Sequence, residues 1–360
     1  MSHSHDDTFQ DRLAGVLLGT AVGDAVGLPS EGLSPCRRQR LLSGPWRHRL
    51  VCGRGMISDD TEHTLMVAQS LLNYPGDATA FGRSLAWRLR WWFLGLPAGV
   101  GMATARACLK LWLGFPPKRS GVHSAGNGPA MRSALLGAYF HDDQDQIQRF
   151  VTASTVLTHT DPRALTGALA VAHLAAWAVR HDPTKPPDTQ FLEQLLTELA
   201  PADREWTELM DRILTAWSHE TSVPDFASSL GLEGGVTGYV YHTVPVAVYA
   251  WLLHFGDFRA SVEAALNCGG DSDTVGAIVG ALAGGTIGGS GIPADWVDGI
   301  SDWPRSVGLL RKAASRLAQQ KRDGRALGPV SYFWPAVPLR NLVFLIIVLL
   351  HGFRRLAPPY

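Results

Sequence analysis

The chain has 360 residues, of which 46% are apolar and 18% are charged, so it can bury a sizeable core and is not of a disordered type. Its 32 basic and 32 acidic residues cancel, which leaves no global electrostatic argument for binding to nucleic acid or to a membrane surface. Four widely spaced cysteines form no CxxC pair and disfavour a structural zinc site. With no signal peptide evident, they predict reduced thiols in a cytoplasmic protein.

Helical periodicity recurs along the chain, and no stretch alternates apolar and polar residues for long, so an all-α fold is expected. Residues 1–10 are polar and are expected to form a flexible tail. A helix is predicted over residues 11–28, where glycine recurs at positions 15, 19, 23 and 27. This spacing allows close approach of a second helix, or of a ligand to the backbone. Further helices are predicted over residues 62–72, 79–94, 102–113, 129–139, 144–157, 161–180, 188–199, 203–218, 238–255, 258–267, 274–285 and 303–319.

The loop over residues 181–187 lies between helical stretches, but a domain boundary there would separate the acidic clusters, which are expected to work together. One compact domain over residues 11–325 is therefore predicted, followed by an apolar extension over residues 326–360. Within the extension, residues 342–350 (LVFLIIVLL) are all apolar, yet they are too few to cross a bilayer, which takes about twenty residues. We expect this run to pack on the protein body without integral membrane insertion; interfacial membrane contact and a dimer seam are the alternatives.

The acidic clusters lie at residues 58–61 (SDDT) and 269–274 (GGDSDT). Carboxylate and hydroxyl oxygens are the ligands that hard divalent cations prefer. Four acids brought together would repel one another unless a positive charge lies between them. If the fold joins the clusters, they predict a magnesium- or manganese-type centre, which two metals could share. The alternative is helix capping, which explains one acid in each cluster but not the glycine pair.

Three other segments carry candidate chemistry. Glu31 follows the glycine-rich helix. Residues 121–131 (GVHSAGNGPAM) form a glycine-rich loop that opens a helix; its N–H groups suit a diphosphate, although a plain flexible loop fits equally well. His159 lies just before a helix start at Asp161-Pro162, where it could contact a substrate or serve as a core histidine. No GxSxG motif or cysteine–histidine pair is evident, so metal-assisted hydrolysis or transfer is favoured.

Taken together, these segments resemble the ADP-ribosylglycohydrolase family. The resemblance rests on five motifs in the family's order: GVLLGTAVGDAVGLPSE, SDDTEHTLMVAQSL, SAGNGPAMR, HTDPRALTGALA and NCGGDSDTVGAIVGALAGG. It implies a single compact orthogonal helical bundle of the ADP-ribosylglycohydrolase type, with a binuclear metal cleft that holds two Mg²⁺ or Mn²⁺ ions. It also implies hydrolysis of the glycosidic bond that joins ADP-ribose to a modified group.

Position by position, the resemblance implies roles for individual residues. The implied metal ligands are Ser58, Asp59, Asp60, Asp271, Asp273 and Thr274. The implied catalytic residues are Glu31, Asp59 and Asp60. The implied substrate-binding residues are Ser124, Ala125, Gly126, Asn127, Gly128, His159 and Tyr239, the last as an aromatic ring near the adenine. In the nitrogenase-regulating branch of the family, an aspartate precedes the segment that here reads GMATAR; this chain has no acid there, so a mechanism resting on that aspartate does not carry over.

The predicted function is magnesium-dependent removal of ADP-ribose from modified protein side chains, with ADP-ribosylarginine as the favoured linkage. The alternative is an immunity protein for a cognate ADP-ribosylating toxin, which acts by reversing the modification or by binding and occluding the toxin. An inactive structural descendant is disfavoured because the set of acids is complete. Neither nucleic acid nor an integral membrane position is expected.

Overall fold

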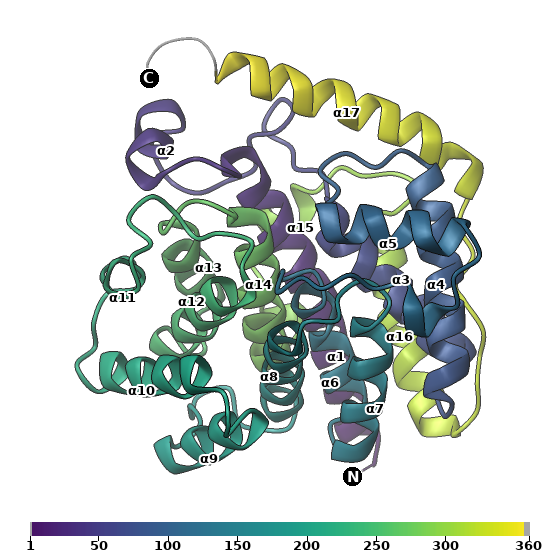
Figure 1. Cartoon of the computed structure of the whole chain (residues 1–360), viewed down its shortest axis with the longest axis horizontal. Coiled ribbons are helices and arrows are strands. Elements are labelled where there is room, and N and C mark those ends of the chain that lie inside the picture. The colour runs from purple at the N-terminus through teal and green to yellow at the C-terminus, as the bar shows by residue number, and fades with distance from the viewer. Residues whose placement is uncertain (1, 356–360) are drawn as a thin grey trace.

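The computed structural model describes residues 2–355, except for the side chains of residues 2–6 and 196. Within these residues the only β-type pairings are isolated bridges, and the predicted all-α class is confirmed (Figure 1). The α-helices are α1 (Ser2–Gly27), α2 (Pro35–Leu41), α3 (Asp59–Asn73), α4 (Ala78–Leu94), α5 (Met102–Trp112), α6 (Ala134–Tyr139), α7 (Gln144–Thr155), α8 (Pro162–Ala178), α9 (Thr189–Leu199), α10 (Arg204–Ser218), α11 (Val223–Ser229), α12 (Val240–Leu253), α13 (Phe258–Leu266), α14 (Ser272–Ile287), α15 (Ala294–Asp298), α16 (Val307–Asp323) and α17 (Val337–Arg354). Single 3-10 turns are η1 (Leu28–Ser30), η2 (Pro117–Arg119), η3 (Ala130–Arg132), η4 (Gly289–Gly291) and η5 (Trp334–Ala336).

Helices α1 and α14 form the centre of the fold and touch backbone to backbone. A Cβ added at Gly23 would lie 1.8 Å from the carbonyl oxygen of Gly276, and one at Gly19 would lie 2.0 Å from that of Gly280. No side chain larger than hydrogen fits between the helices at these positions. Of the two predicted uses of the glycine spacing, close helix packing is therefore the one that the structure adopts. The packing sets the end of α1 against the start of α14, where the second acidic cluster lies.

Residues 2–10, expected to form a flexible tail, are helical in the structure, and their flexibility stays a prediction. Helix α1 begins at Ser2, and the Phe9 ring packs against that of His141 with the centroids 4.9 Å apart. The segment continues a helix whose apolar part, from Leu13 onward, lies in the core. Three helices were also missed: α2, α11 and α15 are each seven residues or fewer. Such short helices contain too few turns for a periodic apolar pattern to emerge.

The C-terminal helix α17 crosses the top of the molecule in Figure 1. It packs on the rest of the protein through one side. Val337, Arg340, Asn341 and Phe344 on that side are buried. The Arg340 guanidinium donates hydrogen bonds to the carbonyl of Ile57 over 2.5 Å and to Glu62 Oε1 over 3.1 Å. The extension is thus tied to the residue that immediately precedes the first acidic cluster.

Candidate active site

The two acidic clusters meet where α3 and α14 begin. Ser58 is the N-cap of α3, as the capping alternative held, and its hydroxyl also donates to Asp60 Oδ2 over 3.2 Å. Thr274, in the first turn of α14, donates its hydroxyl to the same oxygen over 3.3 Å. Capping and juxtaposition therefore occur together, because the cap places the first acids at the point where the second cluster arrives.

The second cluster is held by backbone pairing rather than by side-chain capping. Asp271 occupies the N-cap position of α14, but its side chain makes no cap hydrogen bond and instead accepts one from Asn127 Nδ2 over 2.6 Å. The preceding residue, Gly270, has a φ of +78° and donates its N–H to the Leu33 carbonyl over 2.8 Å. A Cβ on Gly270 would lie 2.0 Å from the Val236 carbonyl oxygen, so only glycine fits. Gly269 has a φ of +66°, and a Cβ there would lie 2.7 Å from the Leu33 carbonyl oxygen, so both members of the glycine pair have a structural reason that capping does not give.

Asp24 is a site residue that the sequence interpretation missed. It is fully buried in α1, and its carboxylate accepts hydrogen bonds from the N–H of Ser58 over 2.9 Å and from the N–H and hydroxyl of Thr61 over 3.2 and 2.5 Å. Burial raises the pKa of Asp24 to about 7, although these hydrogen bonds oppose the shift. A single acid within a buried apolar helix was the available signal, since such a group needs partners. Through these hydrogen bonds, Asp24 of α1 fixes the position of the first turn of α3.

The remaining acids oppose one another's ionisation. Burial, and then the charges of neighbouring carboxylates, raise the pKa values of Asp59, Asp60 and Asp273 well above their ordinary range. Burial raises the pKa of Glu31 as well, and the charge of Asp271 adds to that shift. A cation placed among these groups would favour their charged forms and reverse the shifts.

The chemistry of this donor set fits a hard divalent cation. Asp60 Oδ1 is buried and has no hydrogen-bond partner, while carboxylates and the hydroxyls of Ser58 and Thr274 surround the same carboxyl group. Among the described residues, however, no three His, Cys, Asp or Glu side chains are placed to hold one metal ion together. The binuclear geometry that the resemblance implies therefore stays a prediction.

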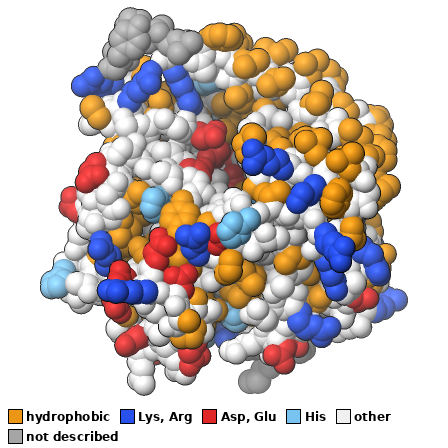
Figure 2. Space-filling model, in the orientation of Figure 1, with side chains coloured by type: hydrophobic (Ala, Val, Ile, Leu, Met, Phe, Trp, Pro, Cys, Tyr) orange, Lys and Arg blue, Asp and Glu red, His pale blue; other side chains and the backbone are white. Residues whose placement is uncertain are grey.

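A cleft of about 500 Å³ opens over the acids, within the range of about 300–1,000 Å³ that small-molecule sites span. Figure 2 shows acidic side chains at the bottom of a hollow in the upper half of this face. The predicted residues in the lining are Glu31, Asp59, Ser124, Gly126, Asn127, Gly128, His159, Asp271, Asp273 and Thr274. Ser58 and Asp60 are buried outside this lining, and Ala125 packs against the core. The lining also includes Gly101, Met102 and Thr104, from the GMATAR segment at the start of α5.

The glycine-rich loop is fastened to the acids by Asn127. Its amide nitrogen donates to Asp271, as described above, and to Thr243 Oγ1 over 3.0 Å, while its backbone N–H donates to the Gly238 carbonyl over 3.0 Å. The loop is therefore part of a fixed wall rather than a plain flexible connection. Asn127 therefore links the glycine-rich loop directly to Asp271 of the second acidic cluster.

His159 lies directly beneath this loop. A Cβ on Gly126 would come within 2.9 Å of its Nε2, so glycine leaves room for the imidazole to reach the cleft. The other ring nitrogen, Nδ1, lies 2.9 Å from the hydroxyl oxygen of Thr158, which accepts a hydrogen bond from Arg132 over 2.8 Å. Burial, helped by the Arg132 charge, lowers the pKa of His159 to about 3, which keeps the ring neutral near pH 7. His159 is thus a buried histidine that also lines the cleft, and its contact with a substrate stays a prediction.

Tyr239, like Ala125, is a predicted substrate-binding residue that the structure does not bring to the cleft lining. Its backbone borders the glycine-rich loop through a bridge with Gly126. Its hydroxyl, however, donates to Glu205 Oε1 over 2.7 Å and accepts from Arg163 over 3.3 Å. These two partners hold the Tyr239 ring next to the glycine-rich loop and outside the cleft that lies over the acids.

Comparison with known proteins agrees with this geometry. Residues 5–326 match the sequence model of the ADP-ribosylglycohydrolase family. The chain is 29% identical over 339 residues to ADP-ribosylarginine hydrolase Tri1 of Pseudomonas putida, covering 88% of this chain and 81% of Tri1. It is 26% identical over 330 residues to ADP-ribosylhydrolase ARH3 of Gallus gallus, covering 79% of this chain and 88% of that protein.

One solved structure, described as an ADP-ribosylglycohydrolase-related protein complex, matches with a TM-score of 0.59 and 26% identity. The match covers 88% of this chain and 99% of the other. The family match contains α1 from residue 5 onward, both acidic clusters, the glycine-rich loop and His159, and it ends before η5 and α17. The chain therefore belongs to the ADP-ribosylglycohydrolase family.

Proposed function

We propose that this protein is a divalent-metal-dependent hydrolase that removes ADP-ribose from modified protein side chains, with ADP-ribosylarginine as its preferred substrate. The observation that carries the proposal is the meeting of two acidic clusters at one cleft, recorded by the contact of Thr274 with Asp60. Membership of the family supports the hydrolysis of ADP-ribose linkages. The arginine preference rests on the similarity to Tri1, whose name specifies that linkage.

In this proposal the cations are held by Ser58, Asp59, Asp60, Asp271, Asp273 and Thr274. Two Mg²⁺ or Mn²⁺ ions, when bound, supply Lewis acidity toward substrate hydroxyls and a water molecule. The unpaired oxygen of Asp60 and the raised pKa values of Asp59 and Asp273 support this assignment, because both features are expected where a cation completes the site.

The substrate lies along the wall formed by the glycine-rich loop. Loop N–H groups bind the diphosphate, and the neutral imidazole of His159 forms a hydrogen bond to a ribose hydroxyl or phosphate oxygen through Nε2. Asn127 keeps Asp271 oriented while the substrate is bound. Tyr239 supports this wall from outside through its backbone, and so its role becomes positional.

Proton transfer is carried out by the carboxylates that line the cleft. Glu31 lines the cleft and accepts a proton from the attacking water, with Asp59 as the neighbouring base. The glycosidic bond breaks through a transition state with oxocarbenium character, which the negative charges of these carboxylates stabilise. The water oxygen bonds to the anomeric carbon as the glycosidic bond breaks, and the proton taken by Glu31 passes to the departing side-chain nitrogen. The products are free ADP-ribose and the unmodified side chain.

The decisive test uses three protein substrates: arginine-modified, serine-modified and unmodified. Free ADP-ribose is measured with Mg²⁺, with Mn²⁺ and with excess chelator. Metal-dependent release from the arginine-modified substrate alone supports the full proposal. Release from serine alone corrects the linkage, whereas release that persists in chelator removes the metal from the mechanism.

The second candidate is an immunity protein that binds an ADP-ribosylating toxin. The same assay separates the two, since tight toxin binding without release of ADP-ribose from any substrate would favour occlusion. The structure gives occlusion through the N-terminus little support, because the segment predicted to be a free tail continues α1. A toxin partner is therefore the weaker element of the prediction.

A further inference from the structure

Exposed hydrophobic side chains gather on one region of the molecule. Among the described residues, all exposed large hydrophobic side chains except Val51 lie within residues 74–115 or 303–353. Figure 2 shows these side chains along the upper edge and the upper right of the molecule, where α4, α5 and α17 lie in Figure 1. We call this region the apolar face; its core residues are Trp87, Trp91, Leu94, Leu96, Met102, Trp112, Leu113, Trp334, Leu342, Ile346, Leu349, Leu350 and Phe353.

The apolar face is one continuous surface. Asn341 of α17 donates its amide to the Gly95 carbonyl at the end of α4 over 2.7 Å. Phe344, one turn further along α17, packs with Ala98 in a small cluster of buried apolar side chains. Trp91 is in edge-to-face contact with both Trp87 and Trp112, which joins α4 to α5. Tryptophan at a surface favours the boundary between water and lipid headgroups.

Helix α17 is positioned to lie on a bilayer rather than to cross it. Residues 334–354 are long and apolar enough to span a membrane by composition. Arg340, however, is buried against the body, with its guanidinium bonded to Glu62 and Asp302. Withdrawing α17 into a membrane would break these bonds and leave charges unpaired, which is costly. The helix therefore keeps one side on the protein and presents leucine, isoleucine and phenylalanine on the other.

Charge is distributed unevenly although the chain is neutral overall. No aspartate or glutamate occurs in residues 78–141 or 324–360, the two stretches that build the apolar face. The same stretches contain exposed basic residues, including Arg83, Arg106, Lys118, Arg119 and Arg354. A second copy of the chain would bring another acid-free surface against this one, so like charges would oppose such a dimer. An anionic surface is the complementary partner.

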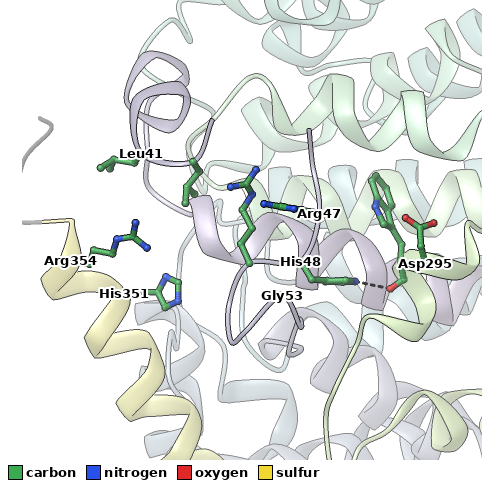
Figure 3. A pocket seen from close by; sticks show the side chains of 10 residues that line it. Leu41, Arg47, His48, Gly53, Asp295, His351 and Arg354 are labelled. Atoms are coloured by element: carbon green, nitrogen blue, oxygen red, sulfur yellow. Dashed lines mark hydrogen bonds between the residues drawn. The ribbon is translucent and has the colours of Figure 1, made fainter. Parts of the chain in front are cut away.

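A basic hollow lies at the C-terminal end of α17. It has a volume of about 440 Å³ and is lined by Arg47, Arg49, His351 and Arg354, among others. Figure 3 shows His351 and Arg354 extending from α17 on one side of it and Arg47 on the other. The one acid in the lining, Asp295, is bonded to Arg259 over 2.8 Å. A hollow with this lining suits a phosphate group next to an apolar helix, which is what an anionic lipid headgroup offers.

We propose that the protein docks on anionic lipid bilayers through the apolar face, with α17 lying flat in the interface and the basic hollow receiving lipid phosphate. Met102 belongs both to the apolar face and to the wall of the active-site cleft. Docking therefore brings the cleft mouth close to the membrane plane, and the modified side chains within reach are those of membrane-associated proteins. This location is independent of the hydrolytic reaction itself.

The test is flotation of the full-length protein with two kinds of vesicle: phosphatidylcholine alone, and an equimolar mixture with phosphatidylglycerol. The variant Ile346→Glu/Leu350→Glu places two charges one turn apart on the exposed side of α17. Its matched control, Gln144→Glu/Gln148→Glu, places two charges at the same spacing on exposed positions of α7. Circular dichroism of each variant confirms folding before flotation.

We expect binding to the anionic vesicles, weakening at high salt, loss of binding in the α17 variant and unchanged binding in the control. Arg47→Gln and Arg354→Gln should each weaken binding by about fivefold, as expected for the loss of one cationic side chain near an anionic bilayer. Absence of flotation overturns the proposal, as does equal binding by the α17 variant. A dimer in solution that the α17 variant dissociates would identify a self-interface instead, and resistance to alkaline extraction would identify a spanning helix.

Discussion

Thr274 donates its hydroxyl to Asp60 Oδ2 across 3.3 Å, and this single contact joins acidic clusters that lie 214 positions apart in the chain. The second oxygen of Asp60 is buried and has no partner. Such a carboxylate costs free energy in the metal-free protein, since burial and the neighbouring carboxylates both disfavour its charge. The same oxygen is available as a cation ligand. The arrangement therefore lowers the stability of the metal-free protein and raises its affinity for a cation.

Asp60→Asn is expected to raise the melting temperature in chelator and to reduce the further rise caused by Mn²⁺. Removing the buried charge relieves the repulsion among the acids, while removing a ligand weakens binding of the cation. Differential scanning fluorimetry with chelator and with a Mn²⁺ series measures both effects. Asp211→Asn on the exposed surface of α10 is the control and should change neither. An Asp60→Asn protein with unchanged Mn²⁺ stabilisation would remove Asp60 from the ligand set.

Gly23→Ala is expected to destabilise the protein strongly and to impair cation binding. The new Cβ would lie 1.8 Å from the Gly276 carbonyl oxygen, so α1 and α14 would have to separate. Overpacking of this kind typically costs about 1–3 kcal/mol or more. Gly76→Ala is the matched control, because a Cβ there has no atom within 4 Å. Chemical denaturation and Mn²⁺ titration of the two variants, compared with the parent, test this. Equal stability of Gly23→Ala and the parent would mean that α1 and α14 can separate without a cost in unfolding free energy.

The helix pattern and the α1–α14 contact illustrate what could be predicted from the sequence. Glycine at every fourth position specifies close packing locally, and α9 begins and ends within one residue of its predicted bounds. The role of Asp24 could not be predicted in the same way. Its carboxylate matters because it accepts hydrogen bonds from Ser58 and Thr61, which lie at the start of a different helix. Interactions between distant segments leave no periodic trace in the sequence.

Arg340→Met is expected to cost about 3–5 kcal/mol of unfolding free energy, as found when one partner of a buried ion pair is removed. The change leaves Asp302 buried without its guanidinium partner and frees Ile57, the residue before Ser58. Adding Asp302→Asn should recover a large fraction of the loss, since that buried carboxylate then carries no unpaired charge. Urea denaturation in a double-mutant cycle measures the coupling. The exposed pair Arg204–Glu208 is the reference, and Arg204→Met there should cost under about 1 kcal/mol.

His159 is expected to contribute to acid destabilisation. Its pKa is about 3 in the folded protein, below the ordinary value of 6.5, so between these values the unfolded chain binds the proton more readily. Stability is therefore complete above about pH 6.5 and falls as the pH drops toward 3, by about 2 kcal/mol at pH 5 from this residue. His159→Gln, which cannot be protonated in this range, should lose less stability than the parent between pH 7 and 5. Parallel denaturation curves at the two pH values test this, and identical losses would show that His159 is not the responsible group.

For the site, as for the fold, motif residues could be predicted from the sequence, but the partners that orient them could not. The sequence interpretation of Asn127 as a member of a substrate loop did not reveal that its amide binds Asp271. Tyr239 was expected near the adenine, yet its hydroxyl is engaged by Glu205, a residue of α10 that carries no motif. Motifs identify which residues meet, whereas the partners that orient them come from segments that have no recognisable pattern.

Glu31→Gln is expected to separate binding from turnover. Glu31 lines the cleft, and the loop that carries it is fixed from outside by Arg355, whose guanidinium donates to the Glu31 carbonyl over 2.6 Å and to that of Pro29 over 2.8 Å. Glutamine keeps the size and the backbone contacts but cannot accept a proton from water. Calorimetry should therefore show nearly unchanged ADP-ribose affinity, while single-turnover hydrolysis should fall by about a hundredfold or more. Asp60→Ala, by contrast, should lose both binding and turnover, because it removes a ligand from the site itself. Full turnover in Glu31→Gln would assign the proton transfer to the aspartates and leave Glu31 as a positional residue.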